Sequence, residues 1–203
     1  ETLRDFRFEG DVWAVREGTV IFPEEPILEV EAPIEQAQLV ETLVLNTVHY
    51  PTLIATKAAR CVLAAPGKTL VDFGLRRTPS LDAGLAAARA AYLAGFAATS
   101  DVLAGARYGI PVSGTVAHSY IESFPSELEA FRAFARTYPG DPILLIDTYD
   151  TVRGAEHAVI VARELAQEGR RVRAVRLDSG DLVALSKAVR EILDRAGFPD
   201  IQI

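Results

Sequence analysis

One of the three histidines of this 203-residue chain, His118, follows a turn of small residues at positions 114–117. The turn comes after the apolar run 110–112, so we expect a strand that ends in a loop carrying the histidine. An imidazole can act as acid, base, ligand or nucleophile near neutral pH, and α/β proteins place such chemistry at strand ends. His118 is therefore the first candidate site residue. His49 and His157 fall in stretches of helical periodicity and are expected to be structural.

Four other apolar runs are also followed by polar groups suited to bind a phosphate or a metal-bound anion. The candidate residues there are Arg76, with Phe73 before it, at the end of the first run, and Asp101 after the second. Asp147 ends the fourth run, and Arg176, Asp178, Ser179 and Gly180 stand at the fifth. One such end would mean little, but five in succession, counting the histidine loop, are difficult to explain as solvated loops. The pattern predicts that these residues gather at one rim of the fold.

The spacing at the fifth run is the most informative. Arg176 and Asp178 stand two residues apart, so their side chains lie on the same face of an extended strand. Ser179 and Gly180 then predict a turn whose backbone amides face an anion or open a helix.

Structural roles compete with these functional ones. Asp147 and Asp178 could each be a helix cap, which is a common role for aspartate before a helix. Phe73 could lie in the core or stack on a planar heterocycle. Arg76 is followed by a second arginine and could be solvated, but its position after a strand end favours a binding role.

The elements that must position these residues alternate regularly beyond residue 66. Short apolar runs span residues 69–74, 95–99, 110–114, 143–147, 172–177 and 201 onward, and helical stretches span residues 82–93, 101–108, 126–137, 154–168 and 181–196. Repeated β/α units predict a parallel sheet with right-handed crossovers. Five or six units suit an incomplete TIM-like (β/α) barrel, which brings the strand ends to one rim.

The first 65 residues are organised differently. Residues 1–33 alternate apolar and polar positions between turns, which predicts a small antiparallel sheet as part of an N-terminal domain. Residues 34–65 have helical periodicity, and Pro51 is expected to break or kink this stretch into two connecting helices. The predicted fold class is thus α/β: a small N-terminal α/β or antiparallel-sheet domain, then an incomplete barrel over residues 66–203.

Composition excludes several classes of protein. With 49% hydrophobic and 24% charged residues the chain is globular, and its net charge of −7 argues against broad binding to nucleic acid or to an anionic membrane. No apolar run approaches the roughly 20 residues that span a bilayer. The single cysteine, Cys61, excludes an internal disulfide framework and, with so few histidines, a cysteine and histidine zinc site. A reducing cytoplasm fits best.

Both ends of the chain suggest a piece of a longer protein. The sequence opens on Glu1 in mid-segment, contains no methionine, and closes on residues 199–203, which resemble the start of a strand. We therefore expect a fragment that lacks both ends.

Nearly the whole chain resembles the nicotinate phosphoribosyltransferases, of the type II phosphoribosyltransferase fold. The matching stretches are EQAQLVE (35–41), TLIATKAAR (52–60), VDFGLRR (71–77), DAGL (82–85), TSDVLAG (99–105), GIPVSGTVAHS (109–119), FPSELEAF (124–131), DTYDT (147–151) and VRLDSGDL (175–182). GTVAHS together with VRLDSGDL is highly specific, whereas DTYDT alone is weak.

The resemblance implies an enzyme that joins nicotinate to phosphoribosyl diphosphate and releases diphosphate and nicotinate mononucleotide. ATP is a co-substrate, and its hydrolysis is coupled through a phosphorylated histidine at the position of His118. A neutral imidazole nitrogen suits this task because it is a good nucleophile toward phosphorus, while a neighbouring carboxylate can orient the ring. The sequence does not say which aspartate does so.

The resemblance also implies which residue contacts each part of the substrates. Phe73 would stack on the pyridine ring, and Arg76 would contact ring or phosphate. Thr115 and Arg176 would help hold nicotinate, the arginine by offering a planar donor fork to its carboxylate. Asp147 and Asp178 would face the ribose hydroxyls or water-coordinated Mg²⁺, without direct metal ligands from the protein. Asp101, Ser179 and Gly180 complete the substrate-binding set, and no organic prosthetic group is implied. Asp101 stands where relatives more often carry asparagine.

Other readings stay open. A nicotinamide- or quinolinate-using phosphoribosyltransferase is the nearest alternative, although GTVAHS and LDSGDL favour nicotinate. From another class, a sugar-phosphate barrel lyase or isomerase is conceivable, but Lys57, Lys68 and Lys187 are not at the predicted strand ends that a Schiff-base lyase needs. The third is a non-catalytic fragment, and we expect little or no turnover by the isolated chain. The resemblance implies a homodimer or higher homo-oligomer.

Overall fold

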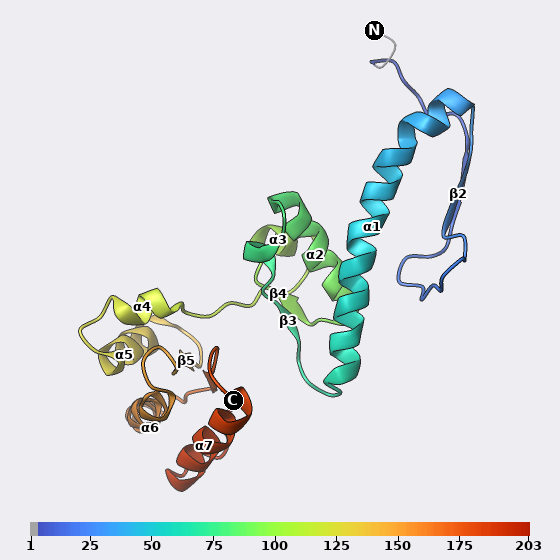
Figure 1. Ribbon diagram of the computed structural model, residues 1–203. Helices are drawn as coiled ribbons and strands as arrows, with labels where there is room; N and C mark the ends of the chain where they lie inside the picture. Colours follow the sequence, from blue (N-terminus) through green and yellow to red (C-terminus); the bar gives the residue numbers. More distant parts are fainter. Residues whose placement is uncertain (1–3) are drawn as a thin grey trace. The chain divides into compact units, whose positions relative to one another are not determined.

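The computed structural model describes residues 4–203, which divide into two compact units. The first unit extends to Gly114, and the second runs from Thr115 to Ile203. Figure 1 shows the helices and strands of both. The first three residues of the predicted segment 1–33 lie outside the described part of the chain.

The first unit begins with a two-stranded antiparallel sheet, as the alternating sequence predicts. Strand β1 (Asp11–Ala14) pairs with β2 (Leu28–Glu31), and Val12 lies opposite Val30. The side chain of Trp13 is about half exposed. Backbone pairing therefore holds this hairpin together more than burial of its side chains does.

One helix, α1 (Ile34–Ala64), follows the hairpin and contains Pro51 in its interior. The expectation that Pro51 breaks this stretch into two helices is therefore wrong. Proline lacks the N–H that would bond the carbonyl oxygen of Thr47, four residues earlier. Thr47 is exposed, so water can hydrate that carbonyl and the helix continues. In its C-terminal half Ala58 is buried, and α1 packs against α2.

Parallel strand pairing organises the rest of the first unit. Its elements are β3 (Val71–Asp72), the 3-10 turn η1 (Leu75–Arg77), α2 (Leu81–Leu93), β4 (Ala98–Thr99) and α3 (Val102–Tyr108). β3 pairs with β4, and Thr99 of β4 bridges in parallel to Val112. The side chains of Ser80 and Asp101 accept backbone N–H bonds from the first turns of α2 and α3, so they cap these helices. The expected alternation of strand and helix is confirmed here.

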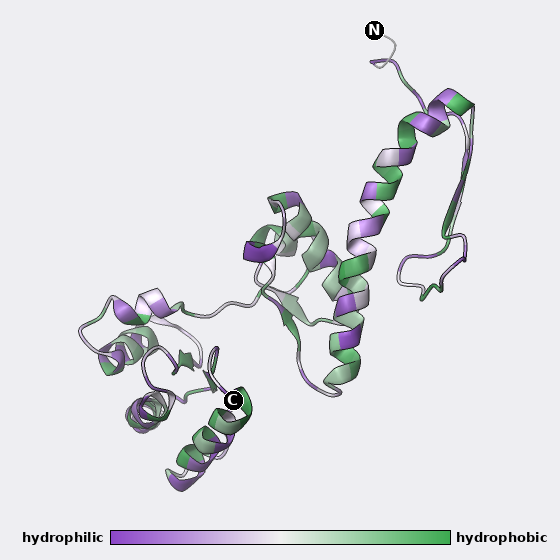
Figure 2. Ribbon diagram, viewed as in Figure 1, coloured by the Kyte–Doolittle hydropathy of each residue, from purple (hydrophilic) through white to green (hydrophobic). Residues whose placement is uncertain are grey.

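The second unit repeats the alternation with longer helices. Its elements are α4 (His118–Glu122), α5 (Glu127–Thr137), β5 (Ile143–Leu145), α6 (Thr151–Gln167), β6 (Ala174–Arg176) and α7 (Leu182–Arg195). β5 and β6 pair in parallel, and Ala174 bridges in parallel to Gln202. Figure 2 shows β5 as apolar, while α7 carries apolar and polar residues along its length. Val189 and Leu193 of α7 are fully buried, which attaches this amphipathic helix to the core.

Helix α6 approaches the end of β5 very closely. A Cβ atom added at Gly154, in the first turn of α6, would overlap the backbone carbonyl of Ile146. The glycine therefore allows the helix to start directly beside the strand end, where Asp147 and Thr148 lie. This close packing fixes the position of the loop between β5 and α6.

A buried carboxyl group connects α5 to α6. Glu127, the first residue of α5, is 5% exposed, and its Oε2 lies 2.8 Å from Nδ1 of His157 on α6. Its other oxygen, Oε1, is buried without a hydrogen-bond partner among the described residues. Burial raises the pKa of the Glu127 carboxyl above its ordinary value, and the hydrogen bond and charge of His157 oppose this in part.

We expect Glu127→Gln to change how stability depends on pH. The folded state binds the Glu127 proton more tightly than the unfolded chain, so this group's stabilisation is full below the ordinary pKa of 4.5. It is lost as the pH rises through the raised folded pKa. A neutral glutamine keeps an oxygen for His157 and removes this loss. Urea unfolding should show the free energy of unfolding of the variant rising relative to that of the wild type between pH 4 and pH 8.

The matched control is Glu129→Gln, an exposed acidic residue in the same first turn of α5. It removes the same helix-terminal charge without changing a buried group. If the free energy of unfolding rose with pH equally in both variants, relative to wild type, the effect would not come from the burial of Glu127. His157, Asp150 and Arg153, the charged or polar groups that act on Glu127 in the wild type, are unchanged in both variants.

The α/β class is confirmed, but a barrel is not seen. Between residues 4 and 203 the strands form three separate two-stranded sheets, and none of them closes. Closure needs one continuous hydrogen-bonded ladder around the sheet, whereas each parallel pair here extends only by one isolated bridge. No helix in the described residues is long and apolar enough to cross a membrane.

Candidate functional site

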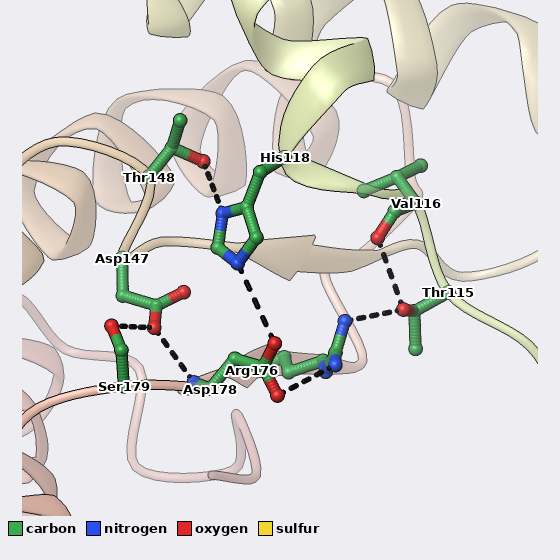
Figure 3. A network of polar contacts seen from close by, with 8 residues as sticks. All are labelled: Thr115, Val116, His118, Asp147, Thr148, Arg176, Asp178 and Ser179. Carbon is green, nitrogen blue, oxygen red and sulfur yellow. Dashed lines mark hydrogen bonds and ion pairs between the residues drawn. The ribbon is translucent and has the colours of Figure 1, made fainter. Parts of the chain in front are cut away.

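The polar strand ends of the second unit come together around His118 (Figure 3). Thr115 lies in the segment that leads into α4, Asp147 and Thr148 follow β5, and Arg176 ends β6. β5 and β6 run parallel in register, with Leu145 opposite Arg176, so their C-terminal ends meet at the same edge. The predicted site residues of this unit thus form one connected network.

Arg176 is held on two sides. Its Nη1 donates to Thr115 Oγ1 at 2.6 Å, and its Nη2 donates to Asp178 Oδ1 at 2.8 Å. The Thr115 hydroxyl donates its own proton to the carbonyl of Val116 at 3.0 Å, so its oxygen is free to accept from the guanidinium. Arg176 and Asp178 meet as their two-residue spacing predicts. The result is a fixed, planar donor group that is 27% exposed.

His118 is the first residue of the short helix α4, not part of the preceding loop as expected. The apolar run before it forms only a single bridge at Val112, so the chain turns into a helix sooner than the sequence pattern indicates. Its ring Nδ1 lies 3.1 Å from Thr148 Oγ1, and its Nε2 lies 3.5 Å from Asp178 Oδ2.

The partners of His118 differ in what they can do. An ionised carboxylate only accepts, whereas a hydroxyl can also donate, so the arrangement favours a proton on Nε2 facing Asp178. Nδ1 then accepts from the Thr148 hydroxyl. The ring is 37% exposed, so a substrate can reach it. Asp178 is thus the carboxylate that lies against the imidazole.

Asp147 organises the turn that follows β6. It is 8% exposed, and its Oδ2 accepts from the backbone N–H of Asp178 at 2.8 Å and from the Ser179 hydroxyl at 2.7 Å. Its other oxygen, Oδ1, is buried without a hydrogen-bond partner among the described residues. Burying a carboxylate oxygen without a partner destabilises the fold by about 1–3 kcal/mol. A donor or cation that reaches this oxygen removes that penalty and is bound more tightly as a result.

The turn needs glycine at its last position. Gly180 has a φ of +78°, a backbone conformation that residues with a side chain rarely adopt. Asp181 follows and caps α7 through Val183 and Ala184, while Asp150 caps α6 through Arg153. Neither Asp147 nor Asp178 caps a helix, so both carboxylates are free of the structural role that competed for them.

The predicted site residues of the first unit lie at its own strand ends. Phe73 follows β3 and is 44% exposed, and Arg76 is an exposed residue of η1. Asp101 is 4% exposed and caps α3, with Oδ1 accepting from the N–H of Ala104 at 3.0 Å. One oxygen of Asp101 thus has a structural partner, whereas Phe73 and Arg76 present their side chains to solvent.

Sequence reasoning missed one residue of the network, Thr148. Its only signal is its place directly after the strand-end residue Asp147, and a threonine there is equally consistent with a loop. Thr148 is recognisable as part of the site only because α4 brings His118 against it. The distance of 30 residues along the chain hides this contact.

No group of three or more histidine, cysteine, aspartate or glutamate side chains suited to a metal ion occurs in the part of the chain that the structure describes. The carboxylate of Asp147 is joined to Asp178 through the backbone N–H of Asp178. The unpaired Oδ1 of Asp147 and the exposed carboxylate of Asp178 fit a hydrated Mg²⁺, which keeps several waters and takes one or two carboxylates with ligand phosphates.

Two family models match the chain. Residues 1–49 match the nicotinate phosphoribosyltransferase (NAPRTase) N-terminal domain, and residues 68–197 match the nicotinate phosphoribosyltransferase (NAPRTase) family. All the residues around His118 fall within the second match.

Similar proteins include nicotinate phosphoribosyltransferases from several organisms. One from Mycobacterium tuberculosis is 56% identical over 99% of this chain and 43% of its own length, and one from Bacillus subtilis is 47% identical over 94% and 39%. The crystal structure of human nicotinic acid phosphoribosyltransferase matches with a TM-score of 0.90 at 35% identity, over 96% of this chain and 49% of that one. The chain thus spans less than half the length of these curated relatives.

Proposed function

This chain belongs to the nicotinate phosphoribosyltransferase family, and from that membership we propose that it forms part of an enzyme of NAD salvage. The enzyme joins nicotinate to phosphoribosyl diphosphate and releases nicotinate mononucleotide and diphosphate. The isolated 203 residues are expected to turn over little or no substrate, because they span about 43% of the length of the Mycobacterium tuberculosis relative.

We propose that ATP is a co-substrate and that His118 accepts its terminal phosphoryl group. The observation that supports this role is the pair of oxygens on the ring: Asp178 at Nε2 and Thr148 at Nδ1, with the ring 37% exposed. An unprotonated nitrogen attacks the γ-phosphorus, a nitrogen–phosphorus bond forms, and the bond to the β-phosphate oxygen breaks, so that ADP leaves. The Asp178 carboxylate stabilises the positive charge that develops on the imidazole.

Arg176 is the proposed holder of the nicotinate carboxylate. Its guanidinium is planar and already fixed by Thr115 and Asp178, so little side-chain freedom is lost when it binds a planar anion through parallel N–H bonds. Thr115 contributes by fixing the guanidinium. Phe73 would stack on the pyridine ring, and Arg76 would contact ring or phosphate.

Asp147, Asp178, Ser179 and Gly180 are proposed to face the ribose and its phosphates. Asp147 and Asp178 would hold hydrated Mg²⁺ through water, and when bound this ion neutralises charge on the diphosphate leaving group. The protein keeps the turn after β6 in place through the bonds that Asp147 makes to Asp178 and Ser179. No organic prosthetic group is part of the proposal.

The finer architecture is also a proposal. Residues 1–33 would belong to an N-terminal sheet domain, residues 34–65 would connect it, and residues 66–203 would contribute to a TIM-like barrel. Parallel strand pairs in both units and the TM-score of 0.90 to the human enzyme support this assignment. We further propose a cytoplasmic protein that works as a homodimer or higher oligomer and binds neither nucleic acid nor membranes.

The experiment is a turnover assay with nicotinate, phosphoribosyl diphosphate, Mg²⁺ and ATP. It compares the 203-residue chain with a full-length chimaera in which this sequence replaces the matching part of the Bacillus subtilis relative. We expect nicotinate mononucleotide from the chimaera and little or none from the chain alone. Parallel assays with nicotinamide, quinolinate and sugar phosphates test the rival substrates. A chimaera that folds but prefers one of these, or turns over nothing, would contradict the proposal.

A further inference from the structure

At the strand ends of the first unit, hydrogen bonds connect Asp72 of β3 with the buried Thr99 of β4. Thr99, which is completely buried, donates its hydroxyl to Asp72 Oδ2 at 2.8 Å and accepts the backbone N–H of Asp101 at 3.0 Å. Asp72 Oδ1 accepts the backbone N–H of Gly74 at 2.9 Å. These bonds join the turn after β3 to the loop after β4. We call Asp72 and Thr99, with these bonds, the brace.

The direction of each bond in the brace is fixed. A backbone N–H can only donate, so the Thr99 oxygen accepts from Asp101, and the hydroxyl proton must point to Asp72. Asp72 then accepts at both oxygens, which suits an ionised carboxylate. The brace therefore has one arrangement of donors and acceptors, and a methyl group at the Thr99 hydroxyl position breaks it at two points.

Backbone bonds reinforce these two strand ends and tie the segment at Ser113 to them. The N–H of Ser100 donates to the carbonyl of Asp72 at 2.8 Å, and the N–H of Ser113 donates to the carbonyl of Thr99 at 3.0 Å. A Cβ at Gly74 would lie 2.9 Å from Asp72 Oδ1. Glycine thus allows the turn to close tightly on the carboxylate.

The side chains carried by these segments are the predicted ligand contacts of the first unit. Phe73 sits between Asp72 and Gly74, at the centre of the turn that the brace closes, and Arg76 follows in η1. Asp101, the residue before α3, uses its Oδ1 to cap that helix. Burial and, to a smaller extent, the negative charge of Asp72 raise the pKa of Tyr50 on α1.

We propose that Asp72 and Thr99 are positioning residues, which hold the Phe73–Arg76 turn and the Asp101 loop in the geometry that binds the pyridine ring. Neither touches substrate. The inference rests on the proposed function for its ligand, but the geometry it describes can be measured without turnover.

The structural test uses Thr99→Val, Thr99→Ser and Asp72→Asn in the 203-residue chain. Valine has the shape of threonine without the hydroxyl, whereas serine keeps the hydroxyl. Amide NMR should show the resonances of Gly74 and Asp101 shifted, and their hydrogen exchange accelerated about 10-fold or more, in Thr99→Val and not in Thr99→Ser. Thr56→Val, which removes an exposed hydroxyl from α1, is the control and should leave both amides unchanged.

The functional test uses the same variants in the full-length chimaera. We expect Thr99→Val to raise KM for nicotinate about 10-fold, with ATP-dependent phosphorylation of His118 unchanged, and Thr99→Ser to restore KM. If Thr99→Val does not fold, Asp72→Asn gives the same readouts. Asparagine has an NH₂ group in place of one carboxylate oxygen, so it can no longer accept both bonds of the brace.

Equal loss of nicotinate binding and of His118 phosphorylation would indicate a general structural role and overturn the proposal. So would a serine variant that behaves like valine, or unchanged Gly74 and Asp101 amides. A wild-type chimaera without any turnover would count against the proposed function alone, because the amide readouts in the chain still decide the role of the brace.

Discussion

Replacing His118 by alanine is expected to lower the ATP-coupled rate of nicotinate mononucleotide synthesis in the full-length chimaera by about 100-fold or more, the scale for loss of a reacting group. The ring nitrogens face Thr148 and Asp178, and alanine offers no nitrogen that can accept the phosphoryl group of ATP. A slow synthesis that ATP does not accelerate should remain, because Arg176 still has both of its partners. Steady-state rates with and without ATP measure the two parts separately.

Two further variants make this result specific. His118→Asn keeps an amide where Thr148 can bond but cannot carry phosphate as an imidazole does, so it should fail as His118→Ala does. His49→Ala removes an exposed histidine of α1 and should behave as wild type. If ATP stimulated His118→Ala as strongly as wild type, His118 would not be the phosphate acceptor.

The second large effect is expected at Arg176. Arg176→Ala should lower kcat/KM for nicotinate by about 100-fold, in the range for losing one member of a hydrogen-bonded charge pair. Arg176→Lys keeps the charge but loses the fork that reaches Thr115 and Asp178 together, so it should recover only a small part of the loss. Kinetics at varied nicotinate and fixed phosphoribosyl diphosphate provide the measurement.

The control is Arg173→Ala, at an exposed position just before β6. It removes the same charge at the opposite end of the strand and should leave kcat/KM within a factor of two or so, as usual for surface changes. If Arg176→Lys were fully active, or if Arg173→Ala were equally damaging, the carboxylate would be held elsewhere.

Local spacing predicted the part of the site that lies within one segment. Arg176 and Asp178 share a face because strand side chains alternate, and their contact follows from that period. Ser126 and Asp181 cap α5 and α7 where the sequence places helix starts. These features depend only on a few neighbouring residues, so they can be predicted from the sequence alone.

Contacts between segments were much harder to predict. Thr148 meets His118 only after α4 and α6 pack into the same unit, and Asp72 meets Thr99 only through the pairing of β3 with β4. The break expected at Pro51 is a different case, because there the local sequence gives a strong signal. Proline usually ends a helix, but hydration of the Thr47 carbonyl and packing of α1 on α2 keep this helix continuous. Whether the two sets of strand ends form one rim stays a prediction.

The most direct test of the account is to identify the phosphorylated atom. The full-length chimaera is incubated with ATP labelled in its γ-phosphate, and the label is located by mass spectrometry and ³¹P NMR under neutral conditions. We predict an acid-labile, alkali-stable phosphoramidate on His118, absent from His118→Ala and discharged when nicotinate and phosphoribosyl diphosphate are added. Label on another residue, or label that persists in His118→Ala, would contradict the central claim that His118 accepts the phosphoryl group.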